Sequence, residues 1–207
     1  MAKTPDLQSA YALRTPDDSR TLYARWAETY DESFARETGY LMPQAVAQAY
    51  AATGGGRAPV LDVGAGTGLV GRALPAGTVI DALDISRQML EVAARTGRYR
   101  GTIEADLTGP LDLASGVYGA VVSAGTFTHG HVGPDALDEL LRIARQDAVF
   151  VLGVNAAFFD AGGFAAKLDA LAPRLRDVIL SEAPIYAPGG AGDHAGDLAR
   201  IVTFFRR

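Results

Sequence analysis

The amino-acid sequence predicts a doubly wound α/β fold with a seven-stranded sheet, mostly parallel with an antiparallel C-terminal strand. Between residues 58 and 171, short apolar runs alternate with segments whose apolar residues recur at helical spacing, which is typical of βαβ units. A glycine-alternating turn follows the first of these runs. Two extended segments, near Val178–Tyr186 and Ala199–Phe205, are expected to close the sheet as a hairpin.

The 207 residues predict one domain, because the sequence contains neither an interdomain linker nor an internal repeat. We expect residues 1–53 to form an N-terminal helical cap and residues 58–207 to form a Rossmann-like core. Residues 1–18 are polar and contain prolines, so we expect an irregular lead there. Hydrophobic residues make up 48% of the chain and charged residues 21%, which suits a globular protein with a substantial core.

The cap is predicted to hold two helices. Apolar residues, most of them aromatic, recur at helical spacing in the first: Tyr23, Trp26, Ala27, Tyr30 and Phe34. The second helix lies near Pro43–Ala52. It should end at Gly54–Gly56, because glycine readily adopts the backbone conformation that closes a helix.

The next segment is the most informative part of the chain. A strand that ends in an acid, Asp62, leads into the glycine-alternating turn Gly64-Ala65-Gly66-Thr67-Gly68, then a helix, then a strand that ends in a second acid, Asp84. Glycines at such a turn allow unusual φ and ψ angles and let a ligand approach the main chain. Asp84 follows Asp62 by roughly 20 residues, the spacing at which an acid can hold a ribose. The segment therefore predicts a nucleoside-cofactor site.

The alternation continues towards the C-terminus. Ser86 can cap a helix, and Pro134 can open another at its first turn, where no N–H is needed. The expected elements are a helix carrying Met89, Leu90 and Ala93, a buried strand Gly119–Ser123, a helix with Leu137, Leu140, Leu141 and Ala144 on its apolar face, a strand Ala148–Val154, and a helix Phe158–Leu171.

A dinucleotide is one alternative for the cofactor, since Gly66, Gly68 and Gly71 fit the pattern G-x-G-x-x-G. Asp62 argues against it, because a carboxylate expected at the mouth of the site repels a pyrophosphate and suits a cationic ligand. The chain also lacks a Tyr-x-x-x-Lys pair and has only the lysines Lys3 and Lys167. A nicotinamide-dependent oxidoreductase is therefore the less favoured reading.

The run Asp62-x-Gly64-x-Gly66-x-Gly68 resembles motif I of the class I S-adenosylmethionine-dependent methyltransferases. The resemblance implies the class I methyltransferase fold and S-adenosylmethionine as cofactor, with Asp84 holding the ribose hydroxyls. Asp106, in a segment similar to the third strand end of that family, would receive the adenine amino group. The implied cofactor-binding residues are Tyr30, Asp62, Gly64, Ala65, Gly66, Thr67, Asp84, Ile85, Met89, Asp106, Leu107, Ser123 and Ala124.

Two roles in that set depend on segments around the site. Trp26–Asp31 resembles the family's Trp-x-x-x-Tyr-Asp segment, which implies that Tyr30 lies over the methionine end of the cofactor. Gly64–Thr67 would hold the methionine portion through main-chain groups, and Asp62 would orient that turn. The segment Ala124–Pro134 is similar to the Williams–Beuren-region methyltransferase-like proteins, a finer resemblance that says little about chemistry.

The loop after the fourth predicted strand is where the methyl acceptor is expected. It lacks an Asn-Pro-Pro-Tyr-like run, so methylation of nucleobase or glutamine amino groups gains no support. His129 has an unperturbed pKa suited to a general base and is the candidate catalytic residue; the alternative is that His129 or His131 only shapes the loop. A His-x-His pair without a clear third ligand predicts no metal site.

Composition restricts the partners and the kinds of chemistry that we expect of this protein. The net charge is −5 and no basic run is present, so we expect no nucleic-acid partner. The absence of cysteine excludes disulfides, thiol nucleophiles and zinc–thiolate sites. The sequence shows no signal peptide and no apolar stretch of membrane-spanning length, so we expect a cytoplasmic protein without a membrane partner.

The sequence as a whole predicts an S-adenosylmethionine-dependent methyltransferase that acts on an unidentified small-molecule acceptor. Two alternatives stay open: a nicotinamide-dependent oxidoreductase, and a non-catalytic module that binds S-adenosylmethionine. The oligomeric state has no signal in the sequence.

Overall fold

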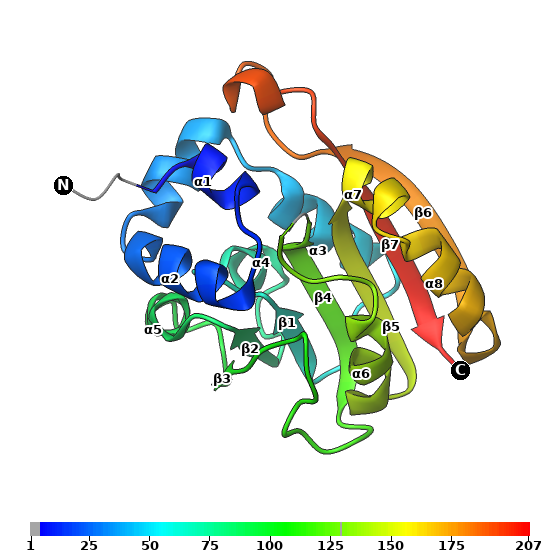
Figure 1. The fold of residues 1–207 in the computed structure, drawn as a ribbon. Helices are drawn as coiled ribbons and strands as arrows, with labels where there is room; N and C mark the ends of the chain where they lie inside the picture. The colour runs from blue at the N-terminus through cyan, green and yellow to red at the C-terminus, as the bar shows by residue number, and fades with distance from the viewer. Residues whose placement is uncertain (1–4, 129) are drawn as a thin grey trace.

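The computed structural model describes residues 5–128 and 130–207, and there a seven-stranded sheet lies between two layers of helices (Figure 1). The strand order is β3-β2-β1-β4-β5-β7-β6. The strands are β1 (Val60–Val63), β2 (Ile80–Asp84), β3 (Gly101–Glu104), β4 (Tyr118–Phe127), β5 (Ala144–Asn155), β6 (Leu175–Pro184) and β7 (Leu198–Arg206). Strands β1 to β5 pair in parallel, whereas β7 is antiparallel to both β5 and β6. The predicted fold class is confirmed.

The helices divide between the two faces of the sheet. The described elements are α1 (Leu7–Tyr11), α2 (Pro16–Trp26), a π-helical segment (Asp31–Arg36), α3 (Met42–Ala52), α4 (Leu69–Ala73), α5 (Arg87–Arg95), α6 (Ala136–Ile143), α7 (Ala156–Ala161) and α8 (Phe164–Leu171), with short 3₁₀ turns at Ala172–Arg174 and Gly192–His194. Buried side chains of α6, α7 and α8 pack on one face, and those of α2, α3 and α4 pack on the other.

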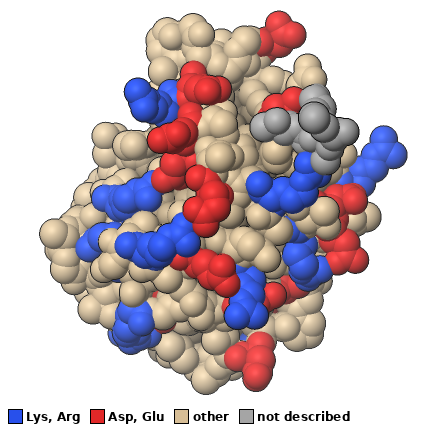
Figure 2. Space-filling model, turned by 90° about the vertical axis from the view of Figure 1, so that its left-hand side faces the viewer, with Lys and Arg blue, Asp and Glu red and all other residues tan. Residues whose placement is uncertain are grey.

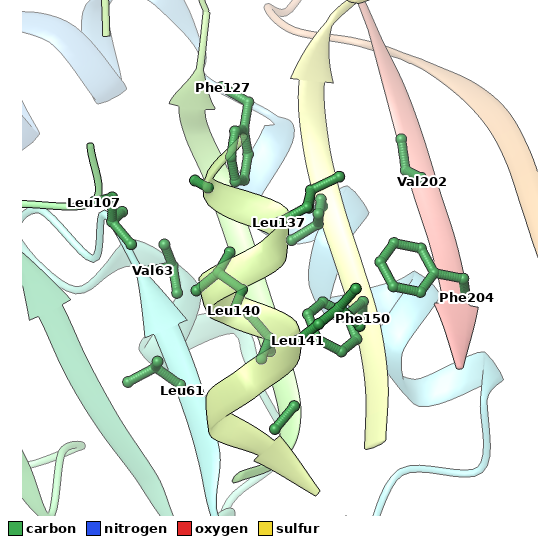
Figure 3. Packing of buried hydrophobic residues seen from close by; sticks show 14 of the residues in the cluster. Leu61, Val63, Leu107, Phe127, Leu137, Leu140, Leu141, Phe150, Val202 and Phe204 are labelled. Atoms are coloured by element: carbon green, nitrogen blue, oxygen red, sulfur yellow. The ribbon is translucent and has the colours of Figure 1, made fainter. Parts of the chain in front are cut away.

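The two cores follow from the alternation of side chains along each strand. In β1, Leu61 and Val63 point into the core beneath α6, whereas Val60 points into the opposite core. Figure 3 shows the first of these clusters, where side chains of α6 meet those of β1, β5 and β7. Phe150 stacks on Phe204 there, with ring centroids 4.7 Å apart. Burying one such side chain contributes roughly 1.5–3 kcal/mol.

The N-terminal cap differs from the expectation in two places. The lead does not stay irregular after residue 5, because Asp6 caps α1 by accepting a hydrogen bond from the Ser9 amide. The expected aromatic helix is interrupted: α2 ends at Trp26 and the chain resumes as the π-helical segment. The interruption lets Tyr30 and Phe34 turn towards the sheet edge while Trp26 stays buried.

The helix expected over residues 158–171 is also divided, into α7 and α8. Gly163 lies between them with a φ of +81°, a left-handed conformation that glycine adopts without strain. Strands β4 and β5 are longer than the sequence predicts. Strand β5 begins at Ala144, a residue that the sequence predicts in the preceding helix.

The strand order places a crevice in a defined position. The chain leaves β1 towards β2 on one side, and β4 lies on the other side of β1. In open α/β sheets, ligands bind at the carboxyl ends of the strands where the order reverses in this way. The glycine turn after β1 lies at this point.

Candidate functional site

Three glycines of the turn after β1 have positive φ, and two of them are required by packing. A Cβ atom on Gly64 (φ +64°) would lie 1.8 Å from Oγ1 of Thr126, and one on Gly68 would lie 2.8 Å from the ring of Tyr99. Gly66 is different: at a φ of +53°, its Cβ position has no atom within 4 Å, and the residue lines a pocket. A ligand can therefore reach the main chain at Gly66.

Side chains of β4 fix the turn from below. The hydroxyls of Ser123 and Thr126 both donate to the carbonyl oxygen of Val63, at 2.7 and 2.9 Å. Ser123 is fully buried and does not line the pocket. Its position anchors the end of β1 to β4, although the sequence suggested a direct contact with the cofactor.

Asp84 joins the end of β2 to the same turn. One carboxylate oxygen accepts a hydrogen bond from the Gly66 amide at 2.8 Å, and the other accepts one from the Ser86 amide at 2.8 Å. Burial raises the pKa of Asp84, and these backbone amides partly offset the rise. The side chain is 8% exposed, and that exposed part faces the pocket.

Asp62 lies beneath the turn, not at the mouth of the site. It is fully buried, and one oxygen accepts a hydrogen bond from the Tyr99 hydroxyl at 2.7 Å, while the other oxygen has no partner among the described residues. Burial raises the pKa of Asp62 to about 7; the Tyr99 bond opposes the rise and the charge of Asp84 adds to it. The location expected from sequence is corrected here.

Tyr99 is a supporting residue that the sequence reasoning missed. Its hydroxyl binds Asp62 and also accepts a hydrogen bond from the Gly71 amide at 3.2 Å, so it links β1 to the start of α4. No local motif marks this role, because Tyr99 lies in the connection between α5 and β3, far along the chain from the residues it contacts.

The cap is tied to the turn by charged and polar contacts. Asp31 accepts a hydrogen bond from the buried hydroxyl of Thr67 and forms an ion pair with Arg72, each at 2.5 Å. Arg95 of α5 contacts Glu28, with 2.9 Å between nitrogen and oxygen. Figure 2 shows acidic and basic side chains interspersed over the face that carries α2 and α5. These contacts hold the cap against α4 and α5.

A pocket of about 1190 Å³, counted with its opening to solvent, lies between the cap and the strand ends. The predicted site residues that line it are Tyr30, Gly64, Gly66, Asp84, Ile85, Met89, Asp106, Leu107 and Ala124. Asp62, Ala65, Thr67 and Ser123 are buried and do not line it.

Asp106 reaches the pocket from the segment after β3. One of its carboxylate oxygens accepts hydrogen bonds from the Thr108 amide at 2.8 Å and the Thr108 hydroxyl at 2.7 Å. This local turn orients the carboxylate before any ligand binds. Leu107 beside it is buried and gives the same part of the pocket an apolar wall.

Aromatic side chains form much of the remaining wall, and most were not predicted as site residues. They come from separated parts of the chain: Tyr11, Tyr23, Trp26, Phe34, Tyr40 and Tyr186. Tyr40 and Tyr186 meet because a β-bridge joins them. Helical spacing in the sequence already grouped Tyr23, Trp26 and Phe34 on one edge of the cap, but only long-range packing brings Tyr186 to the pocket.

His129 lies outside the described residues. Its loop neighbours Thr126, Thr128 and His131 line the pocket, and Nε2 of His131 lies 3.0 Å from the Tyr23 hydroxyl. Within residues 5–128 and 130–207, no group of three or more His, Asp or Glu side chains could hold a metal ion. In the same ranges, no helix is long and apolar enough to cross a bilayer.

Comparisons with known proteins agree with this geometry. Residues 61–152 match the methyltransferase domain family. No curated protein matches the sequence.

Solved structures share the fold over most of the chain. A SAM-dependent methyltransferase from Leishmania major is 12% identical with a TM-score of 0.66, covering 98% of this chain and 87% of its own. A Burkholderia thailandensis 1,6-didemethyltoxoflavin-N1-methyltransferase, solved with 1,6-didemethyltoxoflavin and S-adenosylhomocysteine, is 21% identical with a TM-score of 0.64, covering 94% and 91%. A Methanococcus maripaludis protein assigned to the S-adenosyl-L-methionine-dependent methyltransferases is 15% identical with a TM-score of 0.59, covering 98% and 96%.

The seven-stranded sheet with its antiparallel β7 is the class I methyltransferase fold, and residues 61–152 within it match the methyltransferase domain family.

Proposed function

We propose that this enzyme transfers the methyl group of S-adenosylmethionine to a small molecule bound in the pocket beneath the cap. The observation that carries the proposal is the contact between Asp84 and Gly66. An acid at the end of β2 and an open glycine at the end of β1 face one pocket and are joined by a hydrogen bond. A nucleoside with a polar tail needs these two features side by side.

The residues present fit the cofactor. The open space over Gly66 accommodates the methionine portion against the main chain of Gly64–Thr67. Asp84 already accepts two backbone hydrogen bonds, but a carboxylate offers about four lone-pair sites, so both ribose hydroxyls can still donate to it. Asp106 would accept from the adenine amino group, with Leu107 packing beside the base.

The other predicted residues would complete the cofactor-binding site. Ile85 and Met89 line the pocket next to Asp84 and would pack on the nucleoside, and Ala124 would border the methionine end. Tyr30 would cover that end from the cap. Asp62, Ala65, Thr67 and Ser123 would act indirectly by supporting the turn, because they are buried behind it.

When bound, S-adenosylmethionine supplies a methyl carbon on a sulfonium, and a lone pair of the acceptor forms the new bond as the carbon–sulfur bond breaks. The chain's own part is to align the acceptor with that carbon and to exclude water, which accounts for much of the acceleration in such displacements. A base is needed only when the acceptor atom carries a proton that must leave. His129 stays the candidate for that step.

Two finer readings belong to this proposal. The similarity of Ala124–Pro134 to the Williams–Beuren-region methyltransferase-like proteins would place the chain in that subfamily. The cap and the core would act together as a single methyltransferase domain. Neither reading specifies the acceptor.

Isothermal titration with S-adenosylhomocysteine and with NAD tests the cofactor. We expect binding of S-adenosylhomocysteine and none of NAD, and the reverse result would favour an oxidoreductase. A screen of small molecules scored by release of S-adenosylhomocysteine separates an enzyme from a non-catalytic binding module. Formation of a methylated product supports the enzyme, whereas cofactor binding without turnover of any acceptor supports the module.

A further inference from the structure

The part of the pocket that lies away from the strand ends β1, β2 and β3 has a distinctive composition. It is lined by side chains of α1, the segment before α3, the β4–α6 loop, the end of β5 and the segment after β6: Tyr11, Tyr40, Thr128, His131, Asn155 and Tyr186. We call these six residues the acceptor wall. The cofactor contacts predicted after β1, β2 and β3, which include Gly66, Asp84 and Asp106, come from other elements, so this region is left for the second substrate.

The charges around the pocket restrict that substrate. No lysine or arginine is among the described residues that line it, and the lining carboxylates are Asp84 and Asp106, both on the cofactor side. A carboxylate or phosphate on the acceptor would be buried without a cationic side chain beside it among the described lining residues, at a large cost in free energy. A cationic acceptor would be buried at a similar cost, because none of the six residues of the acceptor wall carries a carboxylate.

The shape and chemistry of the wall favour a flat ring. Tyr40 contacts Tyr186 at 6.1 Å and Phe34 at 5.2 Å between ring centroids. Aromatic rings prefer offset or edge-to-face contact with other rings at such separations, beyond the gain from burial alone. The rings of Tyr11, Tyr40 and Tyr186 also line the pocket, so an aromatic acceptor can make such contacts with them, whereas an aliphatic acceptor gains from burial alone.

The wall is also fixed in place before an acceptor arrives. The Tyr11 hydroxyl donates to Asp197 at 2.8 Å, and its ring stacks on His194 with centroids 4.2 Å apart. His194 in turn contacts Asp197 at 3.0 Å. These contacts join α1 to the β6–β7 connection, so little side-chain freedom is lost when a ring binds against Tyr11.

We propose that the methyl acceptor is a flat, uncharged aromatic molecule that carries a hydroxyl group or a ring nitrogen. This inference rests on the proposed function, since it concerns the second substrate of that same site. Polar groups of Thr128, His131 and Asn155 border the wall and can meet the acceptor's heteroatom. Charged relatives of the same ring should be rejected.

Three probes with one ring system and different charges test the inference: 2-naphthol, 2-naphthoate and 2-naphthylmethylammonium. Their affinities are measured by calorimetry at pH 7.5 on wild-type protein saturated with S-adenosylhomocysteine. We expect 2-naphthol to bind at least tenfold more tightly than either charged probe. Tighter binding of naphthoate or of the ammonium, or no binding of naphthol, would overturn the inference. Binding of S-adenosylhomocysteine is measured first, so failure of the cofactor site is seen separately.

Variants of the wall sharpen the test. Tyr186→Leu removes one ring and should weaken naphthol binding by roughly threefold to tenfold, while Tyr186→Phe keeps the ring and should bind it like the wild type. Both should bind S-adenosylhomocysteine normally. Thr128→Lys adds a cation to the wall and should strengthen naphthoate binding relative to naphthol. Equal naphthol affinity in the wild type and in Tyr186→Leu would place the acceptor elsewhere and overturn the inference.

Discussion

Asp84 is a single residue that bridges two strand ends, through its bonds to the amides of Gly66 and Ser86. Hydrogen bonds to a charged group contribute roughly 1.5–3 kcal/mol each. We expect Asp84→Ala to weaken S-adenosylmethionine binding by about 2–4 kcal/mol, or thirtyfold to a thousandfold. Calorimetry measures this loss.

The variant Asp84→Asn serves as its control, because it keeps an oxygen for the Gly66 amide and loses the charge. It should fold normally and bind with intermediate affinity. An unchanged dissociation constant in a well-folded Asp84→Ala protein would remove Asp84 from the site.

Gly77 is a matched control position for Gly66. Gly66 and Gly77 both have positive φ, at +53° and +81°, and a Cβ on either would meet no atom within 4 Å. Gly66→Val and Gly77→Val should therefore suffer similar backbone strain, of order 1–3 kcal/mol. Only Gly66→Val should abolish cofactor binding, because Gly66 lines the pocket and Gly77 lies in the exposed α4–β2 connection.

Thermal unfolding and calorimetry on the two glycine variants separate strain from occlusion. We expect the two variants to lose similar amounts of stability and only Gly66→Val to lose cofactor binding. Near-native affinity in that variant would mean that the cofactor does not approach Gly66.

His129 is tested by kinetics once an acceptor is known. If it removes a proton in the transition state, His129→Ala should lower the rate by roughly a hundredfold to ten-thousandfold and remove one limb of the pH–rate profile. Cofactor affinity should not change. His131→Ala is the comparison, because it removes the contact with Tyr23 of the cap. A His129→Ala enzyme with normal turnover would end its catalytic assignment.

Among the elements, the cap packs on the core through apolar side chains of α2 and α3, and Asp31 adds two polar contacts, to Thr67 and Arg72. Because the ion pair with Arg72 is partly exposed, most of the effect of Asp31 should come from its bond with the buried Thr67 hydroxyl. We expect Asp31→Ala to weaken cofactor binding roughly threefold to tenfold and to speed proteolysis of the cap.

Asp17→Ala is the matched control for Asp31. Asp17 also carries a negative charge on the cap, but its ion pair with Arg20 stays within α2. That variant should bind the cofactor and resist protease like the wild type. Equal behaviour of the two variants would show that Asp31 does not hold the cap closed.

At the level of the whole molecule, the buried Asp62 makes stability depend on pH. Burial raises its folded-state pKa from 3.8 to about 7, so between these values the folded protein keeps a proton that the unfolded chain has lost. The stability associated with this group is complete below the unfolded pKa and is lost as pH rises towards the folded pKa. Melting temperatures should fall over this window.

Asp62→Asn should make the melting temperature less dependent on pH between pH 3.8 and about 7, because an amide does not titrate. Its oxygen can still accept a hydrogen bond from the Tyr99 hydroxyl. Burial also raises the pKa of Asp84, so a residual slope should persist in the variant. If the melting temperatures of the wild type and Asp62→Asn changed equally with pH, the buried and protonated state of Asp62 would be contradicted.

The sequence by itself determined the fold class and predicted the edge of the sheet at which a cofactor should bind. Both depend on local patterns, since apolar periodicity distinguishes strands from helices and a glycine turn marks the point where a ligand meets the main chain. The predicted residues Gly66, Asp84 and Asp106 line one pocket because parallel strands bring their carboxyl ends to a single edge. Such convergence follows from the topology alone.

Only the tertiary structure decided what lies above and below that edge. Asp62 is buried under the turn because Tyr99 folds back from the α5–β3 connection to bind it. The acceptor wall combines Tyr11, Tyr40 and Tyr186, which are far apart in the sequence and meet through a β-bridge and the Asp197 contact. Periodicity reports only the direction of a side chain relative to its own element, so contacts between distant elements depend on how the whole chain packs.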